Sequence, residues 1–411
     1  MSFRNIFIAI FIGAALIVSA LVVNKARPAS DLGYASAEFV SASGKCAECH
    51  RAETGAVVHQ FERSAHNRAG ITCLECHVPQ DGQEALSHNG FTIATGLTAK
   101  NCASCHTTEY DQFVRSRHAL PAYAAVNGTA NMTAEMIALG ERYHPGAVDR
   151  SPNALIDLEG LGTRVKGCLT CHNIGRPNED GSIGTCTECH SRHDTSIALA
   201  REAKTCGQCH MGPDHSQLEI YEESKHGILF HAQRDSMRLD ANPKSLLVRD
   251  MPIPTCATCH MSGLEGMKVT HDTTERLSYW LFAPVSKKRP GFEAGQAEMQ
   301  DLCTKCHAKS NVDRFYREAE VVLESTNEQV ERAKKVIDDL RAEGLLTPEP
   351  FDEPIEFLYF DYWHYFGRTA KHGAYMGGAD FVQWHGSYEL LAKFVELEEM
   401  AAQLRRELGD K

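Results

Sequence analysis

The hydrophobic pattern is clearest in the last hundred residues, where it predicts long amphipathic helices. Apolar residues recur there at intervals of three and four, which indicates one buried stripe along a helix. The stripe consists of Val312, Phe315, Ala319, Val322, Thr326, Val330, Ala333, Ile337 and Leu340. Gly344 and Pro348 are expected to end this helix. A second helix is predicted over residues 355–371, and a third carries Leu390, Phe394, Leu397, Ala401, Leu404 and Leu408.

The other marked hydrophobic feature is an uncharged run of 18 residues near the N-terminus, from Ile6 to Val23. Its length lies at the boundary between the core of a signal peptide and a membrane-spanning helix. The small-residue cleavage candidates lie inside the run, at residues 18–20, or far beyond it, at residues 35–37. We therefore favour an uncleaved membrane anchor over residues 1–30, and a removed signal segment is the alternative.

Between these regions, strand-like alternation is scarce and one helix is predicted over residues 130–141. The expected fold is mainly α, with short helices and loops over residues 31–310 followed by a long-helix region over residues 311–411. Only 17 Phe, 3 Trp and 12 Tyr serve the 411 residues, so something other than side chains is expected to fill the interior. The formal charge of −12 argues against a nucleic-acid partner, which favours a basic face.

The cysteines indicate what fills the interior. All 16 fall into pairs with two residues between the members, and a histidine follows every pair. The eight motifs are Cys46-Cys49-His50, Cys73-Cys76-His77, Cys102-Cys105-His106, Cys168-Cys171-His172, Cys186-Cys189-His190, Cys206-Cys209-His210, Cys256-Cys259-His260 and Cys303-Cys306-His307. This spacing suits c-type haem, because two thiols one helical turn apart can form thioethers and the adjacent imidazole reaches the iron. Zinc knuckles and disulfide frameworks do not require that histidine.

The sequence therefore predicts a cytochrome with eight covalently bound haem c groups over residues 31–310, each with its motif histidine as the proximal iron ligand. Haem is attached by thioethers outside the cytoplasmic membrane, so we expect the chain to be exported. The expected location is the periplasmic side of the membrane, held by the N-terminal helix. A soluble periplasmic protein would result if the segment were cleaved.

Distal iron ligands must come from the thirteen histidines outside the motifs. One local phrase, an aromatic residue at −5 and a serine at −2, precedes three of them: His66, His118 and His226. We expect these three to be distal ligands. His193, three residues after His190, is a candidate for a neighbouring haem, and weaker candidates are His88, His271 and His372. No role is assigned to His59, His144, His231, His364 and His385.

Two functional classes fit such a cytochrome: a pure electron carrier with two protein ligands on every iron, or an enzyme with one open iron. An open iron needs proton donors and acceptors beside it. Directly after the sixth motif stands Met211-Gly212-Pro213-Asp214-His215, in which a carboxylate and an imidazole are adjacent. Asp214 and His215 are thus candidate catalytic residues, while a turn whose His215 is another distal ligand is the alternative.

Residues 168–231 resemble the octahaem hydroxylamine oxidoreductase family, above all in Cys206-Gly207-Gln208-Cys209-His210 running through Asp214-His215 to Ser224-Lys225-His226-Gly227. His271-Asp272, Ala370-Lys371-His372-Gly373 and Gln383-Trp384-His385-Gly386 are similar as well. The resemblance implies that the fourth haem, on Cys168, Cys171 and His172, is the open catalytic one and that the others are bis-histidine. It also implies that Asp214 and His215 lie over its open face.

The same resemblance implies a homotrimer formed through the C-terminal helices. A modified catalytic haem, cross-linked to a tyrosine of a neighbouring subunit, occurs in oxidative members. Candidates for that residue are Tyr359, Tyr362, Tyr365, Tyr375 and Tyr388.

The expected function is that of an oxidoreductase for a small nitrogen compound: hydroxylamine, nitrite or hydrazine. A cytochrome or a quinol dehydrogenase is the expected redox partner, and a membrane anchor favours the reductive direction. The alternative is a pure carrier between a membrane quinol dehydrogenase and a terminal reductase.

Overall fold

The computed structural model describes residues 37–408, which form two compact units. The first unit extends to Glu75 and includes Arg192–Asp194, and the second comprises Cys76–Ser191 and the chain from Thr195 onward. No helix within residues 37–408 is both long and apolar enough to cross a membrane. The apolar run at residues 6–23 lies outside the described residues. The expected boundary at residue 310 stays a prediction.

The first unit is a set of short helices joined by tight turns. They are α2 (Ala37–Glu53), α3 (Gly55–Arg63), α4 (Ala65–Arg68) and the first turn of α5 (Cys73–His77). The first haem motif lies on α2, and the second motif forms α5 itself. Ser64 caps α4, since its side chain accepts a hydrogen bond from the backbone N–H of Asn67.

Short helices also dominate the second unit as far as residue 304. Its helices here are α6 (Ala99–Ala103), α7 (Thr107–Val114), α8 (Leu120–Asn127), α9 (Ala134–Tyr143), α10 (Ala154–Thr163), η1 (Arg164–Cys168), α11 (Leu169–His172), η2 (Asn173–Gly175), α12 (Ile197–Arg201), α13 (Ala203–Gly207), α14 (Gln217–Glu223), α15 (Lys225–Gln233), η3 (Arg234–Ser236), η4 (Pro243–Ser245), α16 (Cys256–His260), η5 (Leu264–Gly266) and α17 (Phe292–Thr304). The expected mainly-α fold is confirmed.

Two details differ from the expectation for this region. The helix predicted over residues 130–141 begins at Ala134, because Thr133 caps it by accepting a hydrogen bond from the N–H of Met136. Within residues 37–408 there is one sheet, an antiparallel hairpin of β1 (Leu86–His88) and β2 (Phe91–Ile93), in which Ser87 pairs with Thr92.

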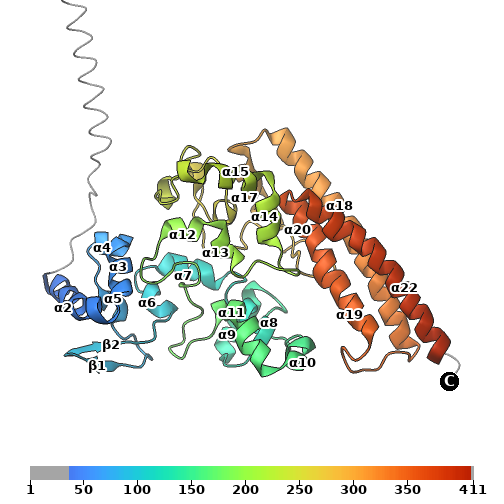
Figure 1. Ribbon diagram of the computed structural model, residues 1–411, viewed down its shortest axis with the longest axis horizontal. Helices are drawn as coiled ribbons and strands as arrows, with labels where there is room; N and C mark the ends of the chain where they lie inside the picture. The colour runs from blue at the N-terminus through green and yellow to red at the C-terminus, as the bar shows by residue number, and fades with distance from the viewer. Residues whose placement is uncertain (1–36, 409–411) are drawn as a thin grey trace, which may run out of the picture. The chain divides into compact units, whose positions relative to one another are not determined.

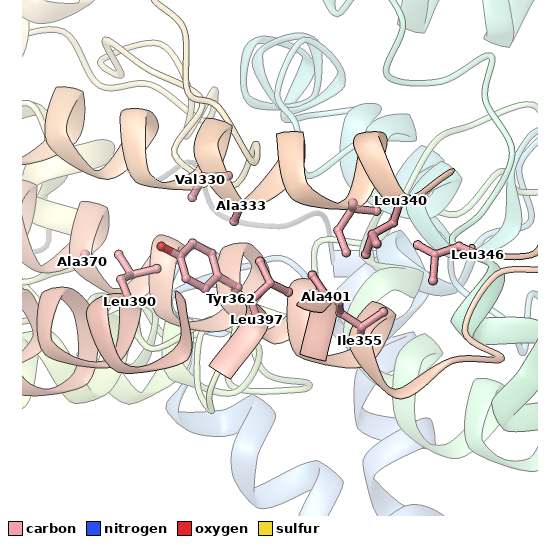
Figure 2. Close-up of a cluster of buried hydrophobic side chains, with 11 residues drawn as sticks. Val330, Ala333, Leu340, Leu346, Ile355, Tyr362, Ala370, Leu390, Leu397 and Ala401 are labelled. Carbon is pink, nitrogen blue, oxygen red and sulfur yellow. The ribbon is translucent and has the colours of Figure 1, made fainter. Parts of the chain in front are cut away.

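The C-terminal region is a helical bundle, as the hydrophobic stripes predict. Its elements are α18 (Lys309–Ala342), α19 (Pro354–Asp361), η6 (Tyr362–Gly367), α20 (Arg368–Met376), α21 (Ala379–Val382), η7 (Gln383–Tyr388) and α22 (Glu389–Leu408). In Figure 1, α18, α19, α20 and α22 pack side by side. The bundle core, shown in Figure 2, includes Val330, Ala333, Ile337 and Leu340 of α18, Tyr362 of η6, and Leu390, Leu397 and Ala401 of α22.

The bundle corrects two expectations. After Ala319 the buried position is Leu323 rather than Val322, because the stripe continues by a step of four residues instead of three. The second predicted helix is interrupted by the π-helical turn η6 and continues past Lys371 to Met376. Such turns widen the helix by one residue and are frequent at functional sites.

Candidate functional site

The haem-attachment motifs share one backbone turn. In four motifs that lie partly or wholly outside regular helices, the histidine N–H donates to the carbonyl of the first cysteine over 2.8–3.1 Å. The donors are His106, His190, His210 and His307. This turn places both thiols and the imidazole around one position, as thioether attachment requires. All sixteen cysteines are free of disulfides, so their thiols suit attachment.

The hydrogen bonds of the proximal histidines also suit haem. The Nδ1 of His172 donates to the carbonyl of Ala122 over 2.7 Å, and that of His77 donates to Ala94 over 2.9 Å. The Nδ1 of His210 lies 3.4 Å from Oε1 of Gln217. A partner on Nδ1 fixes the tautomer and leaves Nε2 for the metal. The residues of this chain therefore fit the group that the motifs predict.

Cysteines of different motifs lie against one another in the second unit. The thiol of Cys102 contacts that of Cys186, and the thiol of Cys206 contacts that of Cys256. A cavity of about 520 Å³, lined by Cys189, Thr205 and Gln208, lies between the fifth and sixth motifs. The thiol of Cys209 in the sixth motif also contacts that of Cys171 in the fourth. The third to seventh motifs are therefore neighbours, which is the arrangement an electron-transfer chain of haems needs.

The repeated phrase before His66, His118 and His226 forms the same turn three times. In each phrase the serine N–H donates to the carbonyl of the aromatic residue three positions earlier, over 2.9–3.1 Å. The three bonds are Ser64 to Phe61, Ser116 to Phe113 and Ser224 to Tyr221. All three serines are buried, and each hydroxyl accepts a backbone N–H two or three residues later. The serine therefore fixes the start of the turn or helix that carries the histidine.

Three predicted distal histidines face proximal ones. Imidazoles on opposite sides of one iron have ring centroids about 6 Å apart, since each metal–nitrogen bond is about 2 Å. The ring pairs and their centroid separations are His226 with His307 at 6.0 Å, His271 with His190 at 6.4 Å, and His118 with His210 at 5.8 Å. Burial lowers the pKa of His118 to about 4 and that of His210 to about 3, so both are uncharged, as metal ligands must be.

The structure says less about the other four candidate distal histidines. His66 lies on α4 and His88 on the exposed strand β1. His193 belongs to the first unit, where its N–H donates to Oε1 of Gln60 over 3.2 Å. His372 is buried on α20, and its Nε2 lies 3.1 Å from Nε2 of Gln217. Their roles as ligands stay predictions.

The Asp214–His215 pair lies beside the proximal histidine of the fourth motif. Nδ1 of His215 is 2.6 Å from Oδ2 of Asp214, and the His215 ring is 6.4 Å from the His172 ring and 6.2 Å from the His210 ring. Because Asp214 is ionised, Nδ1 of His215 must donate the hydrogen bond. The pair predicted from a local motif is thus held next to His172, 42 residues earlier in the chain.

Two residues that the sequence left unassigned complete this cluster, namely His364 on η6 and Arg368 at the start of α20. Nε2 of His364 lies 3.8 Å and Nη1 of Arg368 3.6 Å from Oδ2 of Asp214. Both lie in the helix predicted over residues 355–371, and no local pattern in the sequence marks either of them as a partner of Asp214. We call Asp214, His215, His364 and Arg368 the Asp214 cluster.

The charges in this cluster follow from its burial. Burial alone would raise the pKa of Asp214, but the hydrogen bond from His215 and the positive charge of Arg368 outweigh it and hold that pKa at about 2. Burial and Arg368 lower the pKa of His364 to about 3, so His364 is neutral. Burial lowers the pKa of Arg368 only to about 10. Arg368 is therefore the cation that faces Asp214.

A loop clamped by α20 forms the other side of the cluster. The ring of Phe282 lies 5.0 Å from the His215 ring and 4.8 Å from the His372 ring. Nε of Arg368 donates to the carbonyl of Phe282 over 3.0 Å, and Nζ of the fully buried Lys371 donates to the carbonyl of Ala283 over 2.7 Å. Helix α20 thus positions both Asp214 and the aromatic ring behind His215.

The remaining unassigned histidines have other surroundings. Nε2 of His144 donates to the carbonyl of Arg115 over 2.8 Å, and its ring packs on Trp280. His231 and His385 lie near Glu222 and Asp380 on the surface, and His59 lies on α3. Among the candidate tyrosines, Tyr362 is buried in the bundle core and Tyr388 is 49% exposed. A cross-link stays a prediction.

The motif turns, the paired imidazoles and the helical fold define a multihaem c-type cytochrome. Residues 69–354 match the family described as seven times multi-haem cytochrome CxxCH, so the chain belongs to this family and carries covalently bound haem c. The matched residues contain seven of the eight motifs, and Cys46-Cys49-His50 precedes them.

The chain is also similar to one curated protein and to two solved structures. The chain is 23% identical over 372 residues to a probable nitrite reductase-hydroxylamine oxidoreductase fusion protein of Kuenenia stuttgartiensis, covering 75% of this chain and 39% of that protein. Its fold is similar to that of a hypothetical multiheme protein, with a TM-score of 0.77 and 21% identity over 92% of this chain and 97% of the other. A reducing HAO-like protein complex of Kuenenia stuttgartiensis matches with a TM-score of 0.67 and 20% identity over 90% of this chain and 86% of the other.

Proposed function

We propose that this cytochrome is an oxidoreductase that transforms a small nitrogen compound, hydroxylamine, nitrite or hydrazine, at one open haem held by Cys168, Cys171 and His172. The observation that carries the proposal is the Asp214–His215 pair, joined over 2.6 Å beside the His172 ring. The similarity to proteins described as nitrite reductase-hydroxylamine oxidoreductase and as HAO-like supports it.

Three residues of the chain have separate roles in the proposed reaction: His172, His215 and Asp214. When bound, the haem supplies an iron for the substrate and a path for its electrons. His172 keeps Nε2 for that iron, because its Nδ1 donates to Ala122. His215 donates through Nδ1 to Asp214, which leaves Nε2 as the atom that exchanges protons. Reduction of nitrite takes up protons and oxidation of hydroxylamine releases them, so either direction uses this atom.

The ionised Asp214 has two effects on His215. It holds the imidazole in one tautomer, and its negative charge stabilises the imidazolium that forms when His215 takes up a proton. The hydrogen bond from His215 lowers the pKa of Asp214 despite its partial burial, and Arg368, 3.6 Å from the same oxygen, adds to this effect. Asp214 therefore remains the hydrogen-bond acceptor throughout the proton exchange.

The experiment that tests the proposal measures turnover of the purified holoprotein with nitrite, hydroxylamine and hydrazine. Reduced dyes supply electrons for the reductive direction, and oxidised dyes accept them in the oxidative direction. We expect turnover with at least one of the three compounds. An absence of turnover with all of them, together with no binding of small ligands, would favour the carrier. The carrier is the second candidate because the 6.4 Å separation of the His172 and His215 rings also suits ligation of one iron by both.

We propose further that the chain binds eight haems, because all eight motifs are complete. Mass spectrometry of the denatured protein should show eight haem additions per chain. Seven additions in a fully matured sample, with the peptide around Cys46 and Cys49 unmodified, would contradict this number.

The proposed assembly is an exported homotrimer that exchanges electrons with a cytochrome or a quinol dehydrogenase. Supporting it, Trp384, Tyr388, Leu391 and Val395 form an exposed apolar stripe on η7 and α22, 49–63% exposed. The proposed occupant of this stripe is a second copy of the chain. Native mass spectrometry should show a trimer that the double variant Leu391→Glu, Val395→Glu dissociates, and a native protein that is already monomeric would contradict it.

A further inference from the structure

A second cavity lies close to the Asp214 cluster. Its volume is about 230 Å³, and it is lined by residues of α18 and α19, by the loop between them and by Asn153 at the start of α10. Protein interiors contain few voids larger than one water molecule. At about 30 Å³ per water in the liquid, this cavity has room for several molecules. We call it the access cavity.

The inner wall of the access cavity is aromatic, and His364 lies directly behind it. Phe360 and Trp363 line the cavity. The ring of Phe360 stacks on the ring of His364 with centroids 4.2 Å apart, and the ring of Trp363 meets it edge-on at 4.9 Å. His364 in turn lies 3.8 Å from Asp214. One aromatic layer and one imidazole therefore separate the cavity from the catalytic carboxylate.

Among the mostly apolar residues that line the access cavity there is one ion pair. Nη2 of Arg341 donates to Oε1 of Glu356 over 2.7 Å. The side chain of Glu356 is 6% exposed, whereas that of Arg341 is 52% exposed. The buried carboxylate is thus neutralised, and the guanidinium still reaches solvent. This ion pair gives a small polar solute a hydrogen-bonding contact inside the cavity.

We propose that the access cavity admits the substrate to the Asp214–His215 pair and that Phe360 and Trp363 form its inner gate. The solute that passes is the substrate of the proposed function, a polar compound of two or three heavy atoms. The inference therefore rests on that proposed function. Such a solute can pass only when the ring of Phe360 and the imidazole stacked on it, His364, move aside. A gate of this kind controls the rates of binding and release and leaves the equilibrium affinity unchanged.

The test follows cyanide binding to the oxidised holoprotein by stopped-flow absorbance. Phe360→Ala should raise the association and dissociation rates together by about fivefold or more, while Phe360→Trp should lower both, as expected for a gate that limits access. The dissociation constant should stay within about twofold of the native value in both variants. Phe357→Ala is the matched control, because Phe357 lies one turn earlier on α19, is 46% exposed and does not line the cavity.

The other results of the cyanide experiment distinguish failure of the gate from failure of the proposed function. If the native protein binds no cyanide, the open haem and with it the proposed function are contradicted. If cyanide binds and the rates are equal in the native protein and in the Phe360 variants, the gate is overturned while the proposed function stands. A changed dissociation constant at an unchanged association rate also overturns the gate, because Phe360 would then only support His364. Trp363→Phe repeats the test at the second gate residue should Phe360→Ala fail to fold.

Discussion

The hydrogen bond between His215 and Asp214 gives the sharpest prediction for the mechanism. Removing the imidazole by His215→Ala removes the proposed proton-exchanging atom. Loss of a positioned acid or base lowers rates by about 10²–10⁴-fold, so we expect turnover to fall by at least 100-fold. The proximal ligand His172 and the thioether cysteines are untouched, and all eight haems should remain attached.

Asp214→Asn is a smaller change than His215→Ala, because it keeps the hydrogen bond to His215. An asparagine oxygen can still accept from Nδ1 of His215, but the negative charge is lost. Hydrogen bonds to charged groups contribute about 1.5–3 kcal/mol and neutral ones about 1 kcal/mol, so loss of the charge costs about 0.5–2 kcal/mol. Since each 1.4 kcal/mol is a factor of ten, turnover should fall by about 2- to 30-fold, less than for His215→Ala.

The assay compares steady-state turnover with the high-spin haem signal. In the proposed mechanism both variants lose turnover while that signal stays as in the native protein. If His215 were instead a distal ligand, His215→Ala would create a new high-spin iron and could increase binding of small molecules. Unchanged turnover in both variants would remove the pair from the mechanism.

Three further predictions concern Arg368 in the Asp214 cluster, the carboxylate of Asp180 and the core of the C-terminal bundle. Arg368→Gln removes the cation that faces Asp214 and should lower turnover about tenfold, with partial rescue by Arg368→Lys and little change for the exposed control Arg405→Gln; equal effects of all three variants would refute this role. Burial would raise the pKa of Asp180, but hydrogen bonds from Thr98 and Ser182 outweigh it and lower that pKa, so the stability from this carboxylate is present above the usual aspartate pKa and is lost as pH falls through the lowered value. Asp180→Asn should therefore cost about 1–2 kcal/mol at neutral pH, measured by thermal unfolding, and the difference from native should vanish in acid; a difference independent of pH would refute it. In the bundle core, Ile337→Ala should cost about 2–4 kcal/mol and the exposed Val321→Ala on the same helix less than about 0.5, and equal thermal midpoints would contradict the burial of Ile337 in the core.

Much of this protein can be predicted from local sequence, and particular residues show why. A C-x-x-C-H motif closes within one helical turn, so its histidine and first cysteine meet wherever it occurs. The stripe from Val312 to Leu340 repeats at the helical period over eight turns, so α18 was predictable to within three residues. The serine before His226 caps a helix by a contact that spans three residues.

The rest depends on contacts between distant segments. His364 and Arg368 meet Asp214 across 150 residues, and no local pattern marks either of them as a partner. The π-helical turns η1 and η6 are a further feature that was not predicted, and η1 ends on Cys168 while η6 carries His364.

The central claim is that the haem on Cys168, Cys171 and His172 keeps an open coordination position. Titration of the fully reduced holoprotein with carbon monoxide, followed by absorbance, tests it most directly. We predict that one carbon monoxide binds per chain and that replacement of His172 abolishes this response while sparing most of the other haem signals. Binding of no carbon monoxide by a protein that carries all its haems would contradict the claim and identify the chain as an electron carrier.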